Sequence, residues 1–216
     1  MAERSIDAVI FDLGGVLAAN GRQSDFSKRL PDADATKILR IVMGDYGTDS
    51  DHPWHRLERG EITLEEHRRL NRAAFEEAGI ELPPAQPPPS DGGPAMVFEP
   101  NGPVVALVHE LRAVGMRLGV LTNNIAEFKA GWRTMLPFDE LFDDVVDSHE
   151  VGMRKPNPAI YQLALARLGA EAGRTAFLDD VASNVAAARG VGMVGVVVDE
   201  DPTEAVLAVR RLAGLG

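Results

Sequence analysis

The sequence of 216 residues contains no cysteine. This absence excludes a disulfide-stapled fold, a thiol nucleophile, and zinc or iron–sulfur centres held by cysteine. Long hydrophobic runs are also missing. The longest apolar stretches, such as residues 194–198, are far too short to cross a bilayer, which takes about 20 residues. The first eleven residues include two acidic side chains and no apolar segment typical of a signal peptide. We therefore expect a cytoplasmic protein with no membrane partner.

Positive charge is scarce in this chain. It has 22 Lys and Arg residues against 33 Asp and Glu residues, a formal net charge of −11, and no long basic run. This balance argues against binding to nucleic acid or to anionic membrane surfaces. With 45% hydrophobic and 25% charged residues, the composition is that of a folded globular protein. The length suits one domain, or one domain that carries a smaller insert.

Short β-rich runs alternate with helical patterns in residues 1–20 and from about residue 103 to the end. This alternation is typical of an α/β protein in which helices cover a parallel sheet. The expected strands are Asp7–Phe11, Arg117–Leu121, Asp144–Val146, Thr175–Leu178 and Val194–Val198.

Helix start and stop signals lie between these strands. Asn157 followed by Pro158 is typical of an N-cap and first helical position, and it predicts a helix through Leu168 that ends at Gly169. Residues 201–204 (Asp-Pro-Thr-Glu) repeat this pattern, with the glutamate placed to complete a capping box. These signals support the interpretation of the intervening segments as helices.

The stretch from about residue 20 to residue 82 has helical patterns and no convincing strand. Lys37–Met43 is expected to form one short helix. The sequence Thr-Leu-Glu-Glu, which begins at Thr63, is a capping box that predicts a second helix ending near Gly79. A helical block placed directly after the first strand suggests a cap over the carboxyl end of that strand.

We therefore expect two units, a sheet-containing core of residues 1–19 and 83–216 and a helical cap of residues 20–82. Eight of the fourteen prolines fall between residues 83 and 103, where the chain returns from the cap to the core. A proline-rich stretch of this kind is expected to act as a semi-rigid spacer.

Ligands of parallel sheets bind beyond the carboxyl ends of the strands, so the residues that follow each strand indicate the chemistry. The first strand is followed by residues 12–16 (Asp-Leu-Gly-Gly-Val), and the second by residues 122–124 (Thr-Asn-Asn). The third leads to residues 154–156 (Arg-Lys-Pro), and the fourth to Asp179 and Asp180. A single aspartate at such a position is usually a turn former or helix cap. Four complementary polar sets are not explained by capping alone.

The charges of these sets fit a phosphoryl-transfer site. Asp12, Asp179 and Asp180 would repel one another at one edge of a sheet, so they call for a cation. Ligation by oxygen atoms alone suits Mg²⁺. The cation would hold a phosphoryl group for attack by Asp12, which would give an aspartyl-phosphate. Lys155 would offset the negative charge.

A hydroxyl and an amide follow the second strand, and they suit a phosphate oxygen. The side chain of Thr122 and the backbone N–H of Asn123 are the expected donors to a non-bridging oxygen of the phosphoryl group.

Four segments of the chain resemble the ordered motifs of the haloacid dehalogenase-like hydrolase superfamily. They are FDLGGVL at 11–17, LTNN at 121–124, GMRKPNPAIY at 152–161 and FLDDVASNVAAARGVGM at 177–193. The resemblance covers nearly the whole chain, including RLERGEITLEE at 56–66. It points to the branch that contains the phosphatase domain of soluble epoxide hydrolase and bacterial sugar-1-phosphate phosphatases. Four motifs in the right order are far more specific than any one of them.

The resemblance implies a Rossmann-like core with a small helical cap inserted after the first motif, and a small phosphorylated metabolite as substrate. It also implies a role for each motif residue. The implied roles are nucleophile for Asp12, phosphate binding for Thr122 and Asn123, charge stabilisation for Lys155, magnesium ligation for Asp12, Asp180 and the Gly14 carbonyl, and orientation of Lys155 or a metal-bound water for Asp179.

Gly14 departs from the family pattern. Family phosphatases usually have a second aspartate at this position, where it protonates the leaving group and activates water. Glycine offers a carbonyl to the metal but cannot move a proton. General acid–base catalysis contributes roughly 10²–10⁴-fold in rate, so its loss restricts the enzyme to leaving groups that need little protonation. Anomeric sugar phosphates and acyl phosphates have such leaving groups.

Two alternative functions stay open at this level. The superfamily also contains haloacid dehalogenases, but carbon–halogen hydrolysis needs no metal and does not account for the Asp179–Asp180 pair. A non-catalytic protein that binds a phosphorylated ligand is favoured by Gly14, whereas the retention of Asp12 argues against it.

The sequence does not distinguish a monomer from a homodimer. Arg154 is expected either to bind substrate or to form a surface salt bridge, and Trp54 and Trp132 are expected in the core or in an interface.

The restriction at Gly14 gives a first prediction. We expect sugar 1-phosphates to be hydrolysed faster than the corresponding sugar 6-phosphates, because the anomeric oxygen leaves more readily without a proton donor. Phosphate release from matched pairs measures the ratio directly. Equal rates on both isomers would contradict the restriction.

Overall fold

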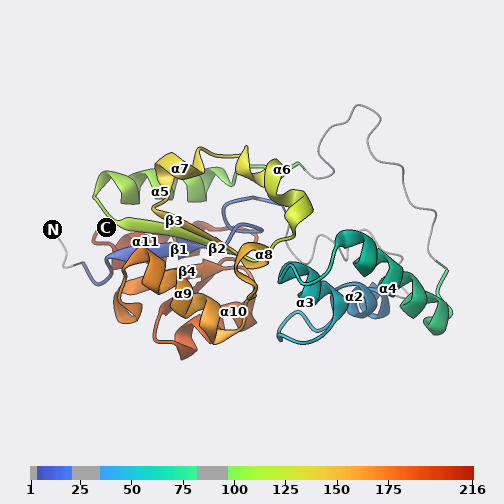
Figure 1. Cartoon of the computed structure of the whole chain (residues 1–216). Coiled ribbons are helices and arrows are strands. Elements are labelled where there is room, and N and C mark those ends of the chain that lie inside the picture. Colours follow the sequence, from blue (N-terminus) through green and yellow to red (C-terminus); the bar gives the residue numbers. More distant parts are fainter. Residues whose placement is uncertain (1–3, 21–34, 82–96) are drawn as a thin grey trace.

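The computed structural model describes residues 4–20, 35–81 and 97–216. Its centre is a five-stranded sheet with the order β3-β2-β1-β4-β5, in which every neighbouring pair is parallel (Figure 1). The strands are β1 (Ala8–Phe11), β2 (Arg117–Thr122), β3 (Asp144–Asp147), β4 (Thr175–Asp179) and β5 (Val194–Val197). The predicted α/β class is confirmed, and every expected strand is present to within one residue at each end.

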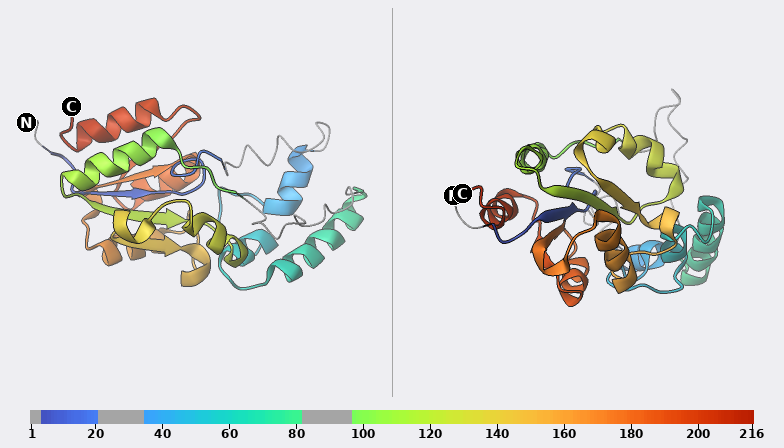
Figure 2. Two further views of the ribbon diagram at one scale, coloured as in Figure 1. Left: turned by 90° about the horizontal axis from the view of Figure 1, so that it is seen from above. Right: turned by 60° about the vertical axis from the view of Figure 1, so that its left-hand side comes forward.

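Helices cover both faces of this sheet. One face carries α5 (Gly102–Ala113), α7 (Phe138–Leu141) and α11 (Thr203–Leu212), and the other carries α9 (Pro158–Leu168) and α10 (Ala182–Gly190) (Figures 1 and 2). The remaining short helices of this unit are η1 (Ala126–Phe128), α6 (Lys129–Arg133), α8 (Ser148–Val151) and η2 (Ala172–Arg174).

Each face of the sheet has its own hydrophobic core because successive side chains of a strand point to opposite sides. Val9 and Phe11 of β1 belong to the core beneath α5 and α11. Ala8 and Ile10 belong to the core beneath α9 and α10. β1 is buried on both sides, as expected for the central strand of a parallel sheet.

The start and stop signals of α9 act as predicted. The side chain of Asn157 accepts a hydrogen bond from the backbone N–H of Ala159, and Gly169 ends the helix in a left-handed conformation with φ of 59°. The last helix differs in detail. α11 begins at Thr203, and Asp201 accepts from the backbone N–H of Thr203 rather than from residue 204.

Three helices lie together beyond the carboxyl edge of the sheet (Figure 1). They are α2 (Ala35–Met43), α3 (Pro53–Glu58) and α4 (Leu64–Ala78). We call residues 35–81 the three-helix segment. The capping box at Thr63 is half formed, because Thr63 accepts from the N–H of Glu66 whereas the Glu66 side chain binds Arg69.

The sequence did not predict α3. Its first residue is Pro53, and proline is well tolerated at this position because that N–H has no partner within a helix. The division into a core of 1–19 and 83–216 and a cap of 20–82 remains a proposal. Most of the proline-rich stretch lies outside the described residues.

Among the helices in the described parts of the chain, none is both long and apolar enough to span a bilayer.

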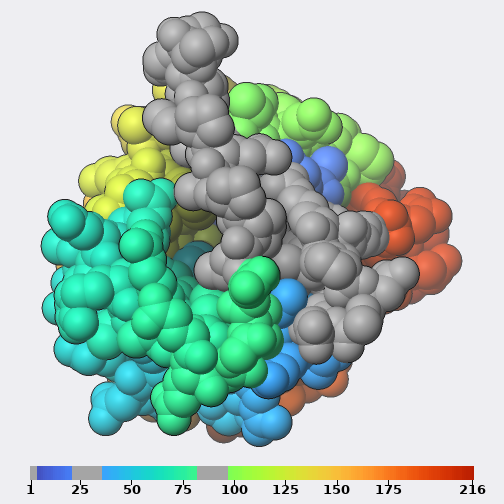
Figure 3. Space-filling model, turned by 90° about the vertical axis from the view of Figure 1, so that its right-hand side faces the viewer, coloured from blue at the N-terminus to red at the C-terminus, as the bar shows by residue number. Residues whose placement is uncertain are grey.

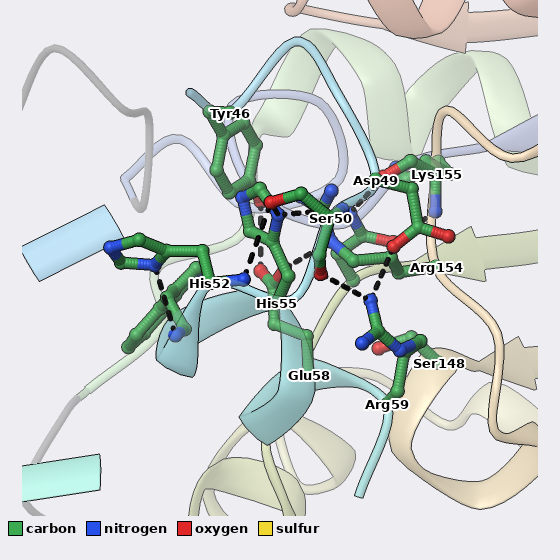
Figure 4. Close-up of polar contacts among 12 residues, drawn as sticks. Tyr46, Asp49, Ser50, His52, His55, Glu58, Arg59, Ser148, Arg154 and Lys155 are labelled. Carbon is green, nitrogen blue, oxygen red and sulfur yellow. Dashed lines mark hydrogen bonds and ion pairs between the residues drawn. The ribbon is translucent and has the colours of Figure 1, made fainter. Parts of the chain in front are cut away.

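A buried ion pair joins the three-helix segment to the core (Figure 4). Nε of Arg154 lies 2.7 Å from Oε2 of Glu58, and both side chains are at most 1% exposed. Arg154 also donates to the backbone carbonyl of Thr48, and its guanidinium lies 5.1 Å from the centre of the Tyr46 ring. The alternative of a surface salt bridge is therefore wrong for Arg154, because this pair is shielded from water.

A second polar cluster in the three-helix segment involves His55. Its Nδ1 accepts from the backbone N–H of Ser50 and lies 2.9 Å from the Ser50 hydroxyl (Figure 4). Burial, reinforced by the nearby charges of Arg154 and His52, lowers the pKa of His55 to about 4. The imidazole is therefore neutral at physiological pH.

Removal of one partner of the buried ion pair between Arg154 and Glu58 should lower the stability of the protein. We expect Arg154→Met to lower the free energy of unfolding by about 3–5 kcal/mol, because the carboxylate of Glu58 is left buried without its partner. Urea unfolding followed by circular dichroism measures this loss. The matched control is Arg69→Met, which removes an exposed ion pair with Glu66 and should leave stability unchanged. A double variant with Glu58→Gln should be less destabilised than Arg154→Met alone, and equal losses would contradict the argument.

His55 should make stability depend on pH. Its pKa is about 4 in the folded protein and about 6.5 in the unfolded chain, so the unfolded chain binds more protons between these values. The stabilisation is complete above pH 6.5 and is lost as the pH falls toward 4. We expect His55→Asn, which retains a hydrogen-bond acceptor, to reduce the stability difference between pH 7 and pH 5 by about 2 kcal/mol. Urea unfolding at both values tests this, and an unchanged difference would refute it.

Candidate active site

The register of the sheet brings the predicted residues to one edge. Phe11 of β1 is level with Val120 of β2 and with Leu178 of β4. The next residue, Asp12, therefore lies beside the ends of both neighbouring strands, and its N–H donates to the carbonyl of Leu178 at 2.8 Å. Strand order reverses at β1, which is where ligands of such sheets bind.

Lys155 lies between two of the predicted carboxylates. Its Nζ is 2.7 Å from Oδ1 of Asp12 and 2.7 Å from Oδ2 of Asp179. The lysine and Asp179 are almost completely buried, whereas Asp12 is slightly exposed toward the pocket. The ammonium group thus balances negative charge that would otherwise be strongly unfavourable at this depth.

The side chain of Asn123 fixes the backbone of Lys155. Its Oδ1 accepts from the Lys155 N–H at 2.7 Å, and its Nδ2 donates to the Lys155 carbonyl at 3.0 Å. These two bonds join the loop after β2 to the loop that carries Lys155. The predicted role of Asn123 rests on its backbone N–H, so the side-chain contact is an additional finding.

Asp179 is surrounded by donors from the protein itself. Besides Lys155, it accepts from the backbone N–H of Val181 at 2.8 Å and from Nδ2 of Asn184 at 3.1–3.2 Å. Asn184 was not predicted as a site residue. It lies within the fourth motif, about one helical turn beyond Val181, and this spacing is the signal that would have indicated it.

The pKa shifts of Asp12 and Lys155 show why a lysine is needed at this position. Burial raises the pKa of Asp12; Lys155 opposes this shift, and Asp179 and Asp180 reinforce it. For Lys155, burial lowers the pKa, but Asp12 and Asp179 outweigh burial and hold the pKa above its ordinary value. The lysine therefore stays charged, and additional positive charge beside Asp12 would favour the ionised carboxylate.

The carboxylates form a set that fits a divalent cation. Asp12, Asp179 and Asp180 each offer an oxygen atom, and these atoms lie within 4.8 Å of one another. Asp12 and Asp180 line the pocket, whereas Asp179 is fully buried and binds Lys155, Val181 and Asn184, so Asp12 and Asp180 are better placed to bind a metal ion. Hard oxygen donors of this kind match Mg²⁺.

These residues line a pocket between the sheet edge and the three-helix segment. Its space of about 710 Å³ includes a part open to solvent. Asp12, Gly14, Thr122, Lys155 and Asp180 line its inner end. Thr122 is 2% exposed. The structure thus brings together the residues that the sequence indicated, whereas the assigned roles remain predictions.

The three-helix segment supplies the opposite wall. Tyr46 and Trp54 line the pocket, together with Glu58 from the buried ion pair. Figure 3 looks at this end of the molecule from outside, where the surface of the three-helix segment is coloured blue to green. Sequence patterns did not identify these wall residues as part of the site, because side-chain directions in the segment depend on how its helices pack. Trp132 is fully buried in the core, as expected.

Comparison with known proteins places this arrangement in a family. A model of haloacid dehalogenase-like hydrolases matches residues 6–192. The chain is 29% identical over 210 residues to a sesquiterpene phosphatase of Aspergillus oryzae, a match that covers 96% of each protein.

Two longer proteins of Mus musculus contain a similar segment. Acyl-CoA dehydrogenase family member 10 is 35% identical over 224 residues, which is 98% of this chain and 19% of that protein. Bifunctional epoxide hydrolase 2 is 30% identical over 219 residues, which is 94% of this chain and 38% of that protein. The chain therefore corresponds to less than half of either protein.

The fold also matches solved structures. An enzyme of the same family from Bacteroides thetaiotaomicron, crystallised with magnesium and inorganic phosphate, has a TM-score of 0.62 at 20% identity. The match covers 91% of this chain and 96% of that one. The Rossmann-like architecture and the resemblance noted from the four motifs are both confirmed, and the chain belongs to the haloacid dehalogenase-like hydrolases.

Proposed function

We propose that this hydrolase is a Mg²⁺-dependent phosphatase of small phosphate monoesters that works through an aspartyl-phosphate on Asp12. The observation that carries this proposal is the contact of Lys155 with both Asp12 and Asp179, beside Asp180, at the inner end of the pocket. This arrangement combines a nucleophile, a fixed positive charge and a carboxylate set that suits a metal ion.

The chemistry follows from these positions. A carboxylate oxygen of Asp12 forms a bond to phosphorus while the bond from phosphorus to the ester oxygen breaks, and the leaving group departs with that electron pair. Water then hydrolyses the aspartyl-phosphate, which releases inorganic phosphate and restores Asp12. Lys155 stabilises the negative charge during both steps because its ammonium is held in place before the substrate binds.

Thr122 and Asn123 bind the phosphoryl group in this proposal. Thr122 ends β2, Asn123 follows it, and both residues line the pocket. The proposed donors are the hydroxyl of Thr122 and the backbone N–H of Asn123. The Asn123 side chain is occupied by the backbone of Lys155, so it serves to position the lysine. Asp179 does the same from the other side, since it binds the ammonium group directly.

The metal would be held by Asp12, Asp180 and the carbonyl oxygen of Gly14. When bound, Mg²⁺ would neutralise phosphoryl charge and align the group with the nucleophile. The related enzyme crystallised with magnesium and phosphate and the phosphatase among the relatives support this proposal. A small phosphorylated metabolite is the proposed substrate. A cytoplasmic location and a monomeric or homodimeric state remain predictions.

The two alternatives are less well supported. Dehalogenation requires no cation, whereas here three carboxylates gather at one point. A non-catalytic binding protein needs no nucleophile, yet Asp12 faces the pocket and is paired with a buried lysine. The proposed phosphatase uses all of these features.

We expect Asp12→Asn to abolish phosphate release, with a loss of at least about 10³-fold in kcat, because the amide retains the shape but cannot act as the nucleophile. EDTA should abolish the activity of the unchanged protein, and added Mg²⁺ should restore it. A phosphate-release screen over small phosphate esters measures both effects. The matched control is Asp139→Asn, which changes an exposed aspartate of α7 and should retain full activity.

Trapping with beryllium fluoride distinguishes a catalytic protein from one that only binds a phosphorylated ligand. Beryllium fluoride should form a Mg²⁺-dependent adduct with the unchanged protein and none with Asp12→Asn, as intact-protein mass spectrometry or ¹⁹F NMR would show. If no ester is hydrolysed and no adduct forms while the folded protein still binds phosphate analogues, the non-catalytic alternative replaces this proposal.

A further inference from the structure

Besides the residues that directly follow β1 and β4, six apolar or aromatic residues line the pocket. They come from both sides of the opening, the three-helix segment and the loops of the core. The six residues are Met43, Tyr46, Trp54, Phe98, Ile125 and Phe128. A leaving group attached to a phosphate at the inner end of the pocket would therefore lie against aromatic rings.

The charged residue that the three-helix segment contributes to the pocket already has its partners. Glu58 is the charged residue of the three-helix segment that lines the pocket, and its carboxylate binds Arg154 at 2.7 Å and accepts from the Tyr46 hydroxyl at 3.1 Å (Figure 4). Among the described lining residues, the only cation is Lys155, which is held between Asp12 and Asp179. Among these described residues, a leaving group with its own carboxylate or phosphate would meet no unpaired positive charge.

The inner end of the pocket restricts the leaving group in a second way. Gly14 lies beside Asp12 and provides no group that can donate a proton. The leaving oxygen must therefore depart as an anion or take a proton from water. A phenol has a pKa near 10, as in tyrosine, whereas that of an aliphatic alcohol is closer to the value of about 15.7 for water. An aryl oxide thus leaves far more readily than an alkoxide.

We propose that the preferred substrates are phosphate monoesters of aryl groups that carry no charge of their own. This inference rests on the proposed phosphatase function and narrows it to one class of leaving group. The aromatic ring would contact Tyr46, Trp54 and Phe128, in offset-stacked or edge-to-face arrangements. In the first step the oxygen of Asp12 bonds to phosphorus, the bond from phosphorus to the aryl oxygen breaks, and the aryl oxide takes a proton from water.

Three esters of similar size separate the two parts of the argument. Phenyl phosphate and cyclohexyl phosphate differ mainly in how easily their oxygen leaves. Phenyl phosphate and 4-carboxyphenyl phosphate both have aryl leaving groups but differ in charge. We expect kcat/KM for phenyl phosphate to exceed that for cyclohexyl phosphate by at least about 100-fold and that for 4-carboxyphenyl phosphate by at least about 10-fold. Glucose 1-phosphate, which has a good but strongly polar leaving group, should also be hydrolysed more slowly than phenyl phosphate.

Two variants test the two causes of the expected preference, the missing proton donor at Gly14 and the missing positive charge beside the leaving group. Gly14 does not have a positive φ, so a side chain is compatible with its backbone. Gly14→Asp should raise the activity on cyclohexyl phosphate relative to phenyl phosphate, because it adds a proton donor. Phe128→Arg places a cation on the half-buried outer wall and should raise the ratio of 4-carboxyphenyl to phenyl phosphate at least about 10-fold. The matched control is Leu207→Arg on α11, which adds the same charge at an exposed position outside the pocket lining and should leave this ratio unchanged.

The outcomes distinguish this inference from the proposed function. If cyclohexyl phosphate, 4-carboxyphenyl phosphate or glucose 1-phosphate is hydrolysed as fast as phenyl phosphate, in a reaction that Asp12→Asn abolishes, the substrate class is wrong and the phosphatase function stands. If none of these esters is hydrolysed while other esters of the broad screen are, the substrate class is again wrong. If no ester of the screen is hydrolysed, the phosphatase function itself fails, and if hydrolysis persists in Asp12→Asn, the mechanism through Asp12 fails. Circular dichroism and a cooperative thermal transition confirm that each variant is folded.

Discussion

The site depends on one charge balance, the ammonium group of Lys155 held between the carboxylates of Asp12 and Asp179. Three carboxylates close together at a buried sheet edge would otherwise repel one another and favour protonation. The lysine offsets part of this charge and leaves a net negative set that suits a divalent cation. Because the ammonium contacts Asp12 directly and Lys155 lines the pocket, the group that stabilises the cluster in the folded protein is also the one that would face a bound phosphoryl group in the proposed reaction.

The sheet makes this balance possible. Parallel strands end at the same edge, and β1 is hydrogen-bonded on both sides, so Asp12, Thr122 and Asp179 are placed by backbone register rather than by flexible loops. Lys155 comes from a loop, and it therefore needs separate support. The two hydrogen bonds from the Asn123 side chain supply that support, since they fix both polar groups of the lysine backbone.

The sequence predicted the strands and the site residues well because they depend on local patterns. Buried strands are apolar runs, and the polar residues that follow them must meet at one edge. The wall of the pocket could not be predicted in the same way, because Trp54 and Tyr46 reach it only through the packing of α2, α3 and α4. Arg154 was misjudged for a related reason. Its partner Glu58 is 96 residues away, and no local pattern reveals a buried pair across that separation.

Arg154 and Lys155 are neighbours in the chain but face different partners, and this has a consequence for how the pocket is built. Arg154 binds Glu58 and the Thr48 carbonyl of the three-helix segment, whereas Lys155 binds Asp12 and Asp179 of the core. Consecutive Cα atoms are about 3.8 Å apart, so one residue cannot shift far without the other. The position of the three-helix segment and the position of the Lys155 ammonium are therefore linked through a single peptide unit. A displacement of the three-helix segment would disturb either the buried ion pair or the contact between Lys155 and Asp12.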